Sequence, residues 1–312
     1  MTDIKSQLVK DGTRWKVLTG TPLEHAIISF IHKSWGSELM THFPGPQPIS
    51  IERKHFPILK KGTYVVCEKS DGVRHLLVSL LFGDKKMCVL VNRAFSIYIV
   101  SLNLPKVAYQ GTILDGELVD ETLLVYDAVC VSGTDVKKCN LFERLKGADS
   151  VVSGILRMKT DPISITIKTF YSLKDFKTFQ DVLPTLKYKV DGLVFTPVNE
   201  PIRIGTHDTM FKWKPRDLNT IDFQAKKWGN RWGLYVSEKG RLIFESELSL
   251  EQTPDWITED CIVECQYMCD EEPRWWKPVG LRTDKKHPNN RMTFYRTLVN
   301  IRENIQISEY LK

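Results

Sequence analysis

A lysine at the end of a predicted strand is the side chain in this sequence best suited to nucleophilic chemistry. Residues 64–67 are strand formers, and a Ser-Asp-Gly turn signal at 70–72 directly follows Lys69. Only a neutral amine attacks an electrophile, and burial beside a cation such as Arg74 favours the neutral amine. The stretch therefore indicates a nucleophilic lysine, although a hairpin with a surface Lys–Asp ion pair would also explain it.

Two other stretches place acids beside glycine at strand positions. Asp115 and Glu117 flank Gly116 in a strand-like run, and Asp191 stands before the apolar run 193–195. Glycine in a strand lets a backbone or ligand approach closely, and carboxylate oxygens bind hard cations. A bulge or a turn with solvated acids is the alternative for each stretch alone.

Two basic stretches could hold phosphate. Lys212 and Lys214 share one face of a predicted strand that has aromatic residues on its other face, so both ammonium groups can converge on one phosphate. Arg282, Asp284 and Lys285 follow the last predicted strand. An edge strand or a basic surface loop would explain either stretch alone. Neither a GxxxxGK[ST] nor a GxGxxG loop occurs, so side chains must hold any nucleotide.

The elements that position these residues follow from hydrophobic periodicity and turn signals. We expect helices at 21–36, at 51–60 after a Ser50 cap, at 140–160 and at 173–186. Strands are expected at 62–69, 74–82, 86–92, 95–100, 112–119, 123–131, 164–170, 191–197 and 209–214. Short links between strands favour antiparallel neighbours, which predicts an α+β fold.

The pattern changes after Pro215. Five strands are expected at 221–226, 231–236, 241–247, 260–268 and 274–281, a number that suits a small closed barrel. Asn290 then caps a helix, and helical spacing predicts a packed face of Met292, Tyr295, Leu298 and Val299.

Composition limits the class of protein. The 312 residues are 42% hydrophobic and 26% charged, enough for one large or two medium domains. No apolar run of about 18 residues and no signal peptide occur, so we expect a soluble intracellular protein, without preference for nucleus or cytoplasm. The net charge of +6 permits a polyanionic partner, and seven cysteines without a CxxC pair indicate reduced thiols rather than zinc.

The five motifs KSDGVR, LDGE, VDGLVF, FKWKP and RTDK, in this order, resemble those of the covalent nucleotidyltransferases. These are the mRNA capping guanylyltransferases and the ATP- or NAD-dependent ligases. GPQPISIERK at 45–54 and LVNIRENI at 298–305 look most similar to the compact capping guanylyltransferases of large DNA viruses. The resemblance covers nearly the whole chain. It implies a nucleotidyltransferase domain at 1–215, with ATP-grasp-like antiparallel sheets and helices, and an OB-fold barrel at 216–303. The tail 304–312 would pack back on the first domain.

The resemblance also implies a role for each motif residue. Lys69 would attack the α-phosphate of GTP and form a lysyl-GMP intermediate, and Glu68 would belong to the same nucleotide site. Arg74 and Glu117 would hold the ribose. The remaining nucleotide contacts would be Arg93 to the ribose or phosphates, Tyr126 stacked on the purine, and Ser132 and Lys168 at the guanine edge.

Phosphate and metal contacts follow from the same resemblance. Asp191 and Glu117 would bind a divalent metal, Mg²⁺ or Mn²⁺, and Lys212 and Lys214 would grip the α-phosphate. The leaving phosphates would meet three residues of the second domain, Arg282, Asp284 and Lys285. Closure of that domain over GTP and its reopening for RNA are then part of the mechanism.

The expected function is GMP transfer to the 5′-diphosphate end of RNA by a monomer. An RNA triphosphatase and a cap methyltransferase would be separate proteins, because the two domains use the entire chain. An ATP-dependent RNA or DNA ligase is the nearer alternative, and the RTDK motif argues against it. A nucleic-acid-binding relative that has lost catalysis is the other, but both acid motifs and the motif lysines are retained.

Overall fold

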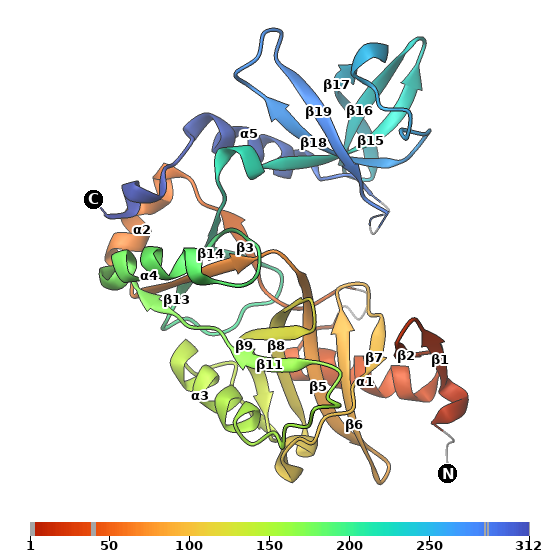
Figure 1. The fold of residues 1–312 in the computed structure, drawn as a ribbon, viewed down its shortest axis with the longest axis vertical. Helices are drawn as coiled ribbons and strands as arrows, with labels where there is room; N and C mark the ends of the chain where they lie inside the picture. The colour runs from red at the N-terminus through yellow and green to blue at the C-terminus, as the bar shows by residue number, and fades with distance from the viewer. Residues whose placement is uncertain (1–3, 39–41, 284, 286, 312) are drawn as a thin grey trace. The chain divides into compact units, whose positions relative to one another are not determined.

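The computed structural model describes residues 4–38, 42–283, 285 and 287–311, and it forms two compact units (Figure 1). Residues 1–49 and 58–212 make the first unit, and residues 50–57 and 213–312 make the second. The seven cysteines are free thiols, as predicted. No described helix is both long enough and apolar enough to cross a bilayer.

The larger sheet of the first unit has the strand order β1-β2-β7-β6-β5-β8-β9-β10, with β11 beside β9. Its strands are β1 Leu8–Asp11, β2 Arg14–Val17, β5 Val73–Phe82, β6 Lys85–Asn92, β7 Ile97–Ile99, β8 Thr112–Val119, β9 Thr122–Val131, β10 Thr134–Asp135 and β11 Ser164–Ile167. Neighbours are antiparallel, as predicted, except that β11 runs parallel to β9. The β1–β2 hairpin was not predicted from the sequence.

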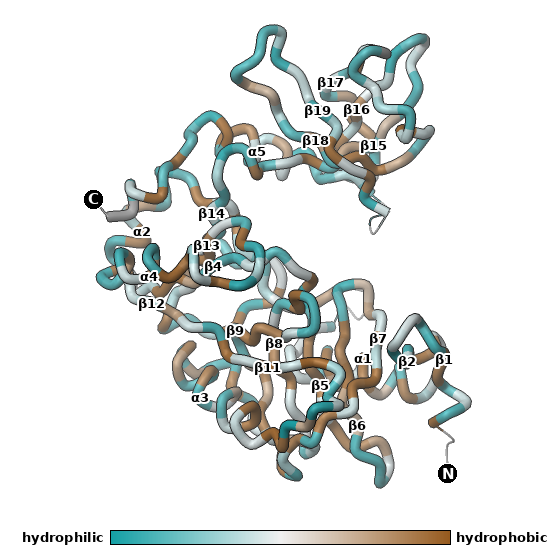
Figure 2. The backbone as a smooth tube through the Cα atoms, viewed as in Figure 1, coloured by the Kyte–Doolittle hydropathy of each residue, from teal (hydrophilic) through white to brown (hydrophobic). Residues whose placement is uncertain are grey.

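Both faces of the middle of this sheet are covered, which is why strands β5, β6, β8 and β9 bury most of their residues. Helix α1 (Pro22–Trp35) packs Leu23, Ile27 and Ile31 on the face that carries Leu76 and Val78. Helix α3 (Leu141–Val152) lies against the core on the opposite face, which carries Leu77. Figure 2 shows hydrophobic segments along strands β5, β6 and β8.

A second sheet has the order β12-β4-β13-β14-β3. Its strands are β12 Tyr171–Ser172, β4 Tyr64–Ser70, β13 Val190–Pro197, β14 Thr206–Trp213 and β3 Gln47–Ser50. The helix expected at 173–186 is shorter: 3₁₀ turns at Leu173–Asp175 and Leu183–Thr185 flank α4 (Phe176–Val182). Pro184 explains its end, because proline cannot donate the backbone bond that continues a helix.

The predicted Ser50 cap is wrong. Ser50 ends strand β3, which pairs with β14, and this sheet pairing replaces the local cap. The chain turns helical later, at a 3₁₀ turn Arg53–His55 followed by α2 (Phe56–Lys61). Glu52 caps that turn, and its backbone N–H donates to His55 Nδ1 at 3.0 Å.

The second unit contains a five-stranded antiparallel sheet of order β17-β16-β15-β18-β19. The strands are β15 Thr220–Trp228, β16 Arg231–Glu238, β17 Arg241–Leu248, β18 Ile262–Met268 and β19 Trp275–Leu281. The edge strands β17 and β19 approach one another, which is consistent with the expected OB-like barrel.

Helix α5 (Arg291–Glu303) begins where predicted, with the Asn290 side chain accepting from Met292 N at 2.9 Å. Its predicted packing face is wrong at Met292 and Tyr295, which are exposed, whereas Leu298 packs against the core as predicted. The buried face carries Phe294, whose ring lies 5.8 Å from both Phe223 and Trp276. This aromatic contact sets the rotation of the helix, which periodicity alone does not determine.

Candidate active site

Lys69 is paired with Asp191 across two neighbouring strands. Val190 pairs with Ser70 and Gly192 pairs with Lys69, so Asp191 is the extra residue of a bulge in β13. A bulge redirects a side chain, and here it turns the Asp191 carboxylate toward the Lys69 amine. Lys69 Nζ lies 2.8 Å and 3.0 Å from the two carboxylate oxygens. The Lys69 side chain is 28% exposed, so a reactant can reach it.

Lys168 supports the strand on both sides of Lys69. Its Nζ donates to the Glu68 carbonyl at 2.8 Å and to Ser70 Oγ at 2.9 Å, and it lies 3.0 Å from Glu68 Oε1. Tyr188 OH donates to the same Glu68 carboxylate at 2.9 Å. Lys168 and Glu68 are both buried, so this pair holds the end of β4 in one conformation.

Arg74 belongs to a second buried network. It donates from Nε and Nη2 to the Asp115 carboxylate at 2.9 Å and 2.5 Å, and from Nη1 to the Pro46 carbonyl at 2.7 Å. Tyr126 OH donates to Asp115 Oδ1 at 2.9 Å. Asp115 pairs with Asp127 and the next residue with Val125, so Tyr126 is the extra residue of a β9 bulge. Asp115 thus holds both the arginine and the tyrosine.

Glu117 lies between these networks. It pairs with Arg74 in the β5–β8 register, so the two side chains leave the same face of the sheet. Burial raises the pKa of Glu117. The charges that oppose this rise come from four cations: Lys69, Lys168, Arg74 and Arg93. Since one carboxylate senses all four, the structure brings these predicted residues together around Glu117.

The close packing of the strands explains the glycine of the lysine motif, Gly72, and the glycine of the LDGE motif, Gly116. A Cβ on Gly72 would lie 2.5 Å from the Leu118 carbonyl oxygen, and one on Gly116 would lie 2.8 Å from that of Leu124. Only glycine therefore permits the turn after Lys69 to sit against β8, and β8 to approach β9.

Three other predicted residues lie on or after other strands of the two sheets. Ser132 donates its backbone N–H to Thr112 Oγ1 at 3.0 Å. It directly follows the end of β9, six positions after Tyr126. Lys212 is on β14, beside β13 in the second sheet, and Lys214 follows the end of that strand.

The second unit has a cationic loop bound to one buried acid. Arg282 Nη1 lies 3.2 Å and 3.3 Å from the Asp222 carboxylate oxygens, and Lys285 Nζ also donates to Asp222. Asn289 exchanges two bonds with the Asp222 backbone, at 2.7 Å and 2.8 Å. Asp284 lies outside the described residues.

Asp222 was not identified from the sequence. The sequence cue that could have identified it is an acid between two large apolar residues, Ile221 and Phe223, in a strand-like run. In the structure both neighbours are fully buried. A carboxylate in such a position requires a counter-charge, but the sequence does not say which cation supplies it.

Among the described residues, no group of three or more His, Cys, Asp or Glu side chains could hold a metal ion. Glu117 and Asp191 nevertheless suit Mg²⁺, which proteins often bind through one or two carboxylates together with water and substrate phosphates.

Comparison with known proteins gives two family matches. The model described as mRNA capping enzyme, catalytic domain, matches residues 22–216. The model described as mRNA capping enzyme, C-terminal domain, matches residues 218–311.

Among curated proteins, the mRNA-capping enzyme subunit alpha of Schizosaccharomyces pombe is 29% identical, over 86% of this chain and 79% of the relative. The Danio rerio mRNA-capping enzyme is 27% identical, over 79% of this chain. The chain spans 45% of that longer relative. These relatives are fungal and animal, so the expected closeness to viral enzymes stays a prediction.

Similar solved structures include a mycobacterial DNA ligase D complexed with ATP and MES, with 12% identity and a TM-score of 0.44. That match covers 78% of this chain and 96% of the ligase chain. Similarity at this level does not bear on function.

Proposed function

Because the chain belongs to the mRNA capping enzyme family, we propose that it transfers GMP from GTP to the 5′-diphosphate end of RNA through a lysyl-GMP intermediate. It is a nucleotidyltransferase, an mRNA guanylyltransferase. The observation that supports the covalent intermediate is the bulge that sets the Asp191 carboxylate against the amine of Lys69. The amine is partly exposed and held at one position, as a nucleophile must be.

The proposed reaction has two displacements at one phosphorus atom. Lys69 Nζ gives up a proton to solvent and attacks the α-phosphorus of GTP as the neutral amine. A nitrogen–phosphorus bond forms, the bond to the β-phosphate oxygen breaks to release pyrophosphate, and the nitrogen loses a second proton. A terminal phosphate oxygen of the RNA then attacks the same phosphorus, the nitrogen takes up a proton, and the lysine leaves as the amine. Asp191 orients Nζ through its two hydrogen bonds.

The nucleoside would occupy the space around Glu117. In this proposal Arg74 and Glu117 hold the ribose, Arg93 contacts the ribose or phosphates, and the ring of Tyr126 stacks on guanine. Lys168 donates hydrogen bonds to Glu68 and Ser70, so we propose that it positions β4 as well as contacting the guanine edge. Ser132 is proposed to contact the guanine edge together with Lys168.

The phosphates would be bound by cations from both units. Lys212 and Lys214 are proposed to bind the α-phosphate, and Arg282, Asp284 and Lys285 to bind the leaving phosphates. Arg282 and Lys285 must exchange the Asp222 carboxylate for phosphate oxygens to do so. A divalent metal held by Glu117 and Asp191 would supply charge neutralisation at the phosphates.

We further propose that residues 1–215 and 216–303 act as catalytic and OB-fold domains, and that the protein works as a monomer beside a separate RNA triphosphatase and cap methyltransferase. The name of the Schizosaccharomyces pombe relative describes that protein as a subunit.

Labelling with α-labelled GTP, and separately with ATP, tests the function. The protein is incubated with magnesium, run on a denaturing gel and mapped by peptide mass. We expect a GMP adduct on Lys69 that pyrophosphate or diphosphate-ended RNA discharges. Lys69→Arg should abolish it, because an arginine keeps the positive charge opposite Asp191 but stays protonated.

Lys189→Arg is the matched control, since Lys189 pairs with Asp71 at the same strand ends and is largely exposed. It should label like the wild type. Label that persists in Lys69→Arg would contradict the assignment of the nucleophile. An AMP adduct in place of GMP would contradict the proposed substrate.

A further inference from the structure

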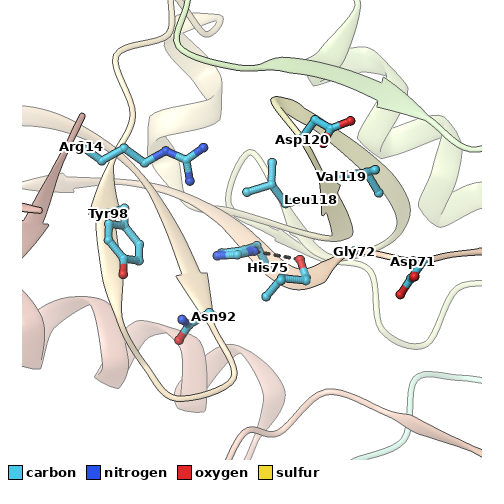
Figure 3. Close-up of a pocket in the computed structure, with 10 residues that line it drawn as sticks. Arg14, Asp71, Gly72, His75, Asn92, Tyr98, Leu118, Val119 and Asp120 are labelled. Atoms are coloured by element: carbon cyan, nitrogen blue, oxygen red, sulfur yellow. Dashed lines mark hydrogen bonds between the residues drawn. The ribbon is translucent and has the colours of Figure 1, made fainter. Parts of the chain in front are cut away.

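A pocket of about 440 Å³ opens on the larger sheet, on the face opposite to Arg74 and Glu117 (Figure 3). Its volume falls within the range of about 300–1,000 Å³ that ligand sites occupy. Side chains from five neighbouring strands line it in the order of the sheet: Arg14 on β2, Tyr98 on β7, Asn92 on β6, His75 on β5 and Leu118 on β8. None of these residues has a role in the proposed GTP site.

The strand register explains why the pocket lies on this face. Side chains alternate along β5, so His75 leaves the sheet on the side opposite to Arg74. His75 pairs with Asn92, and Val73 pairs with Leu118. The same face is filled by the core from Leu77 onward, and the pocket begins where that core ends.

The pocket reaches the turn that follows the reactive lysine. Asp71 and Gly72 line one end of it. Asp71 is two residues from Lys69, and two residues of extended chain span at most about 7 Å. That end of the pocket therefore lies near Lys69. Tyr98 and Arg14 lie on strands two and three places from β5, about 10 Å and 14 Å across the sheet, so a nucleotide bound there can belong to the same RNA strand as a 5′ end at Lys69.

Two polar groups present a hydrogen-bond acceptor beside a donor. His75 Nδ1 lies 2.9 Å from the Val73 carbonyl, and burial lowers the pKa of His75, so the neutral ring donates from Nδ1 and leaves Nε2 as an acceptor. Asn92 Oδ1 accepts from Ala94 N and Ser96 N at 3.0 Å and 2.9 Å, which leaves its NH₂ as the donor. Figure 3 shows a His75 ring nitrogen and the Asn92 amide nitrogen directed into the pocket.

The other wall supplies an aromatic ring and positive charge. Tyr98 OH donates to Asp11 at 3.3 Å, and Lys16 Nζ lies 5.9 Å from the centre of the Tyr98 ring. Arg14 lies near Tyr98, on the neighbouring strand β2 (Figure 3). A ring beside cations is the arrangement that binds single-stranded nucleic acid.

Asp71 and Asp120 also line the pocket, but their carboxylates are directed elsewhere than toward the cations beside Tyr98. Asp71 pairs with Lys189 at 2.7 Å. The Asp120 carboxylate points away from His75 in Figure 3.

We propose that this pocket binds a nucleotide of the acceptor RNA, downstream of the reacting diphosphate, with its base against Tyr98 and a phosphate at Arg14. The inference rests on the proposed guanylyltransferase function. Each RNA base has a donor and an acceptor on its edge, so Asn92 and His75 can bind any of them, and the pocket recognises RNA with little sequence preference.

The test separates transfer to RNA from all other steps. Labelled lysyl-GMP protein is freed of GTP and pyrophosphate, and single-turnover transfer is measured to a diphosphate-ended ten-nucleotide RNA and to ADP. ADP offers the same reacting diphosphate without downstream nucleotides. Arg14→Glu should slow transfer to RNA by about tenfold or more, the size expected for loss of one nucleotide contact, and should slow transfer to ADP at least fivefold less.

Lys10→Glu is the matched control. Lys10 lies on the same β1–β2 hairpin and is exposed, but it does not line the pocket. It carries the same charge change and should transfer to RNA like the wild type. A second pair of variants tests the ring: Tyr98→Leu should slow transfer to RNA, whereas Tyr98→Phe keeps the ring and should retain most of the rate.

The outcomes distinguish the two proposals. Absence of a GMP adduct in the wild type would overturn the guanylyltransferase proposal itself. Suppose that the wild type forms a normal GMP adduct, but Arg14→Glu and Tyr98→Leu transfer GMP to RNA as fast as Lys10→Glu does. That result would overturn the pocket proposal alone. Equal slowing of GMP transfer to RNA and to ADP would also overturn it, because ADP has no downstream nucleotide that could occupy the pocket.

Discussion

The two units hold their cations in different ways. In the first unit Arg74 and Asp115 both lie on strands of one sheet, and their pair is almost completely buried. In the second unit Asp222 lies on a strand, but Arg282 and Lys285 belong to the chain after the last strand and are about one-third exposed, at 27% and 34%. The first arrangement is fixed by backbone register, and the second depends on where a connecting segment lies.

This difference indicates which contacts can change during a reaction. Strand partners cannot separate without breaking a ladder of backbone bonds, so the Arg74 network is a preformed part of the site. Cations on a connecting segment can exchange one set of oxygens for another at lower cost. Arg282 and Lys285 are therefore suited to engage a phosphate that is present only in one step.

The largest expected effect is on stability when Arg74 is changed. Arg74→Leu would leave Asp115 buried without its counter-charge, and removal of one partner of a buried pair typically costs about 3–5 kcal/mol of unfolding free energy. Urea unfolding of the variant and wild type measures it. The control Lys189→Leu breaks a largely exposed pair and should cost less than about 1 kcal/mol. Equal losses would contradict the contrast between buried and exposed pairs.

A smaller effect is expected at Asp222. Asp222→Asn keeps the shape but removes the charge that holds Arg282 and Lys285, and loss of hydrogen bonds to charged groups costs about 1–3 kcal/mol. Thermal unfolding of the variant checks this expectation. Asp260→Asn is the control, because Asp260 is exposed and pairs with Lys226 at 2.9 Å, and it should alter stability little. If Asp222→Asn is as stable as the wild type, the cationic segment is not held by that carboxylate.

The smallest effect concerns pH and Glu117. Burial raises the pKa of Glu117 in the folded protein, so the unfolded chain ionises first as the pH rises, and stability is lost through that range. Glu117→Gln cannot ionise and should gain stability relative to the wild type as the pH rises above about 4.3, the ordinary value for a free glutamate. Urea unfolding from pH 4 to 7 measures the difference.

Glu121→Gln serves as the control for that series, since Glu121 is exposed at the adjoining β8–β9 turn. The stability difference of Glu117→Gln is measured relative to this control at each pH. If the difference for Glu117→Gln does not change with pH, the Glu117 carboxylate is not desolvated in the folded protein.

Much of the first unit could be predicted from local patterns. Apolar strand-forming runs and the turn signals between them located β5, β6, β8 and β9 within a few residues, because these strands are short apolar segments bounded by turn residues such as Gly83 and Asp120. The β1–β2 hairpin was missed, since its two strands have only four residues each and are mostly exposed. The pocket lined by Arg14 depends on that hairpin and was missed with it.

The order of the motifs, the choice of Lys69 as the candidate nucleophile and the positions of the motif glycines follow from the amino-acid sequence alone. Which charged side chains meet depends on the fold. A one-residue bulge turns Asp191 toward Lys69, another sets Tyr126 beside Asp115, and Asp222 reaches across 60 positions to Arg282. These contacts depend on the register between strands far apart in the chain, and a one-residue shift in register reverses the face on which a side chain lies.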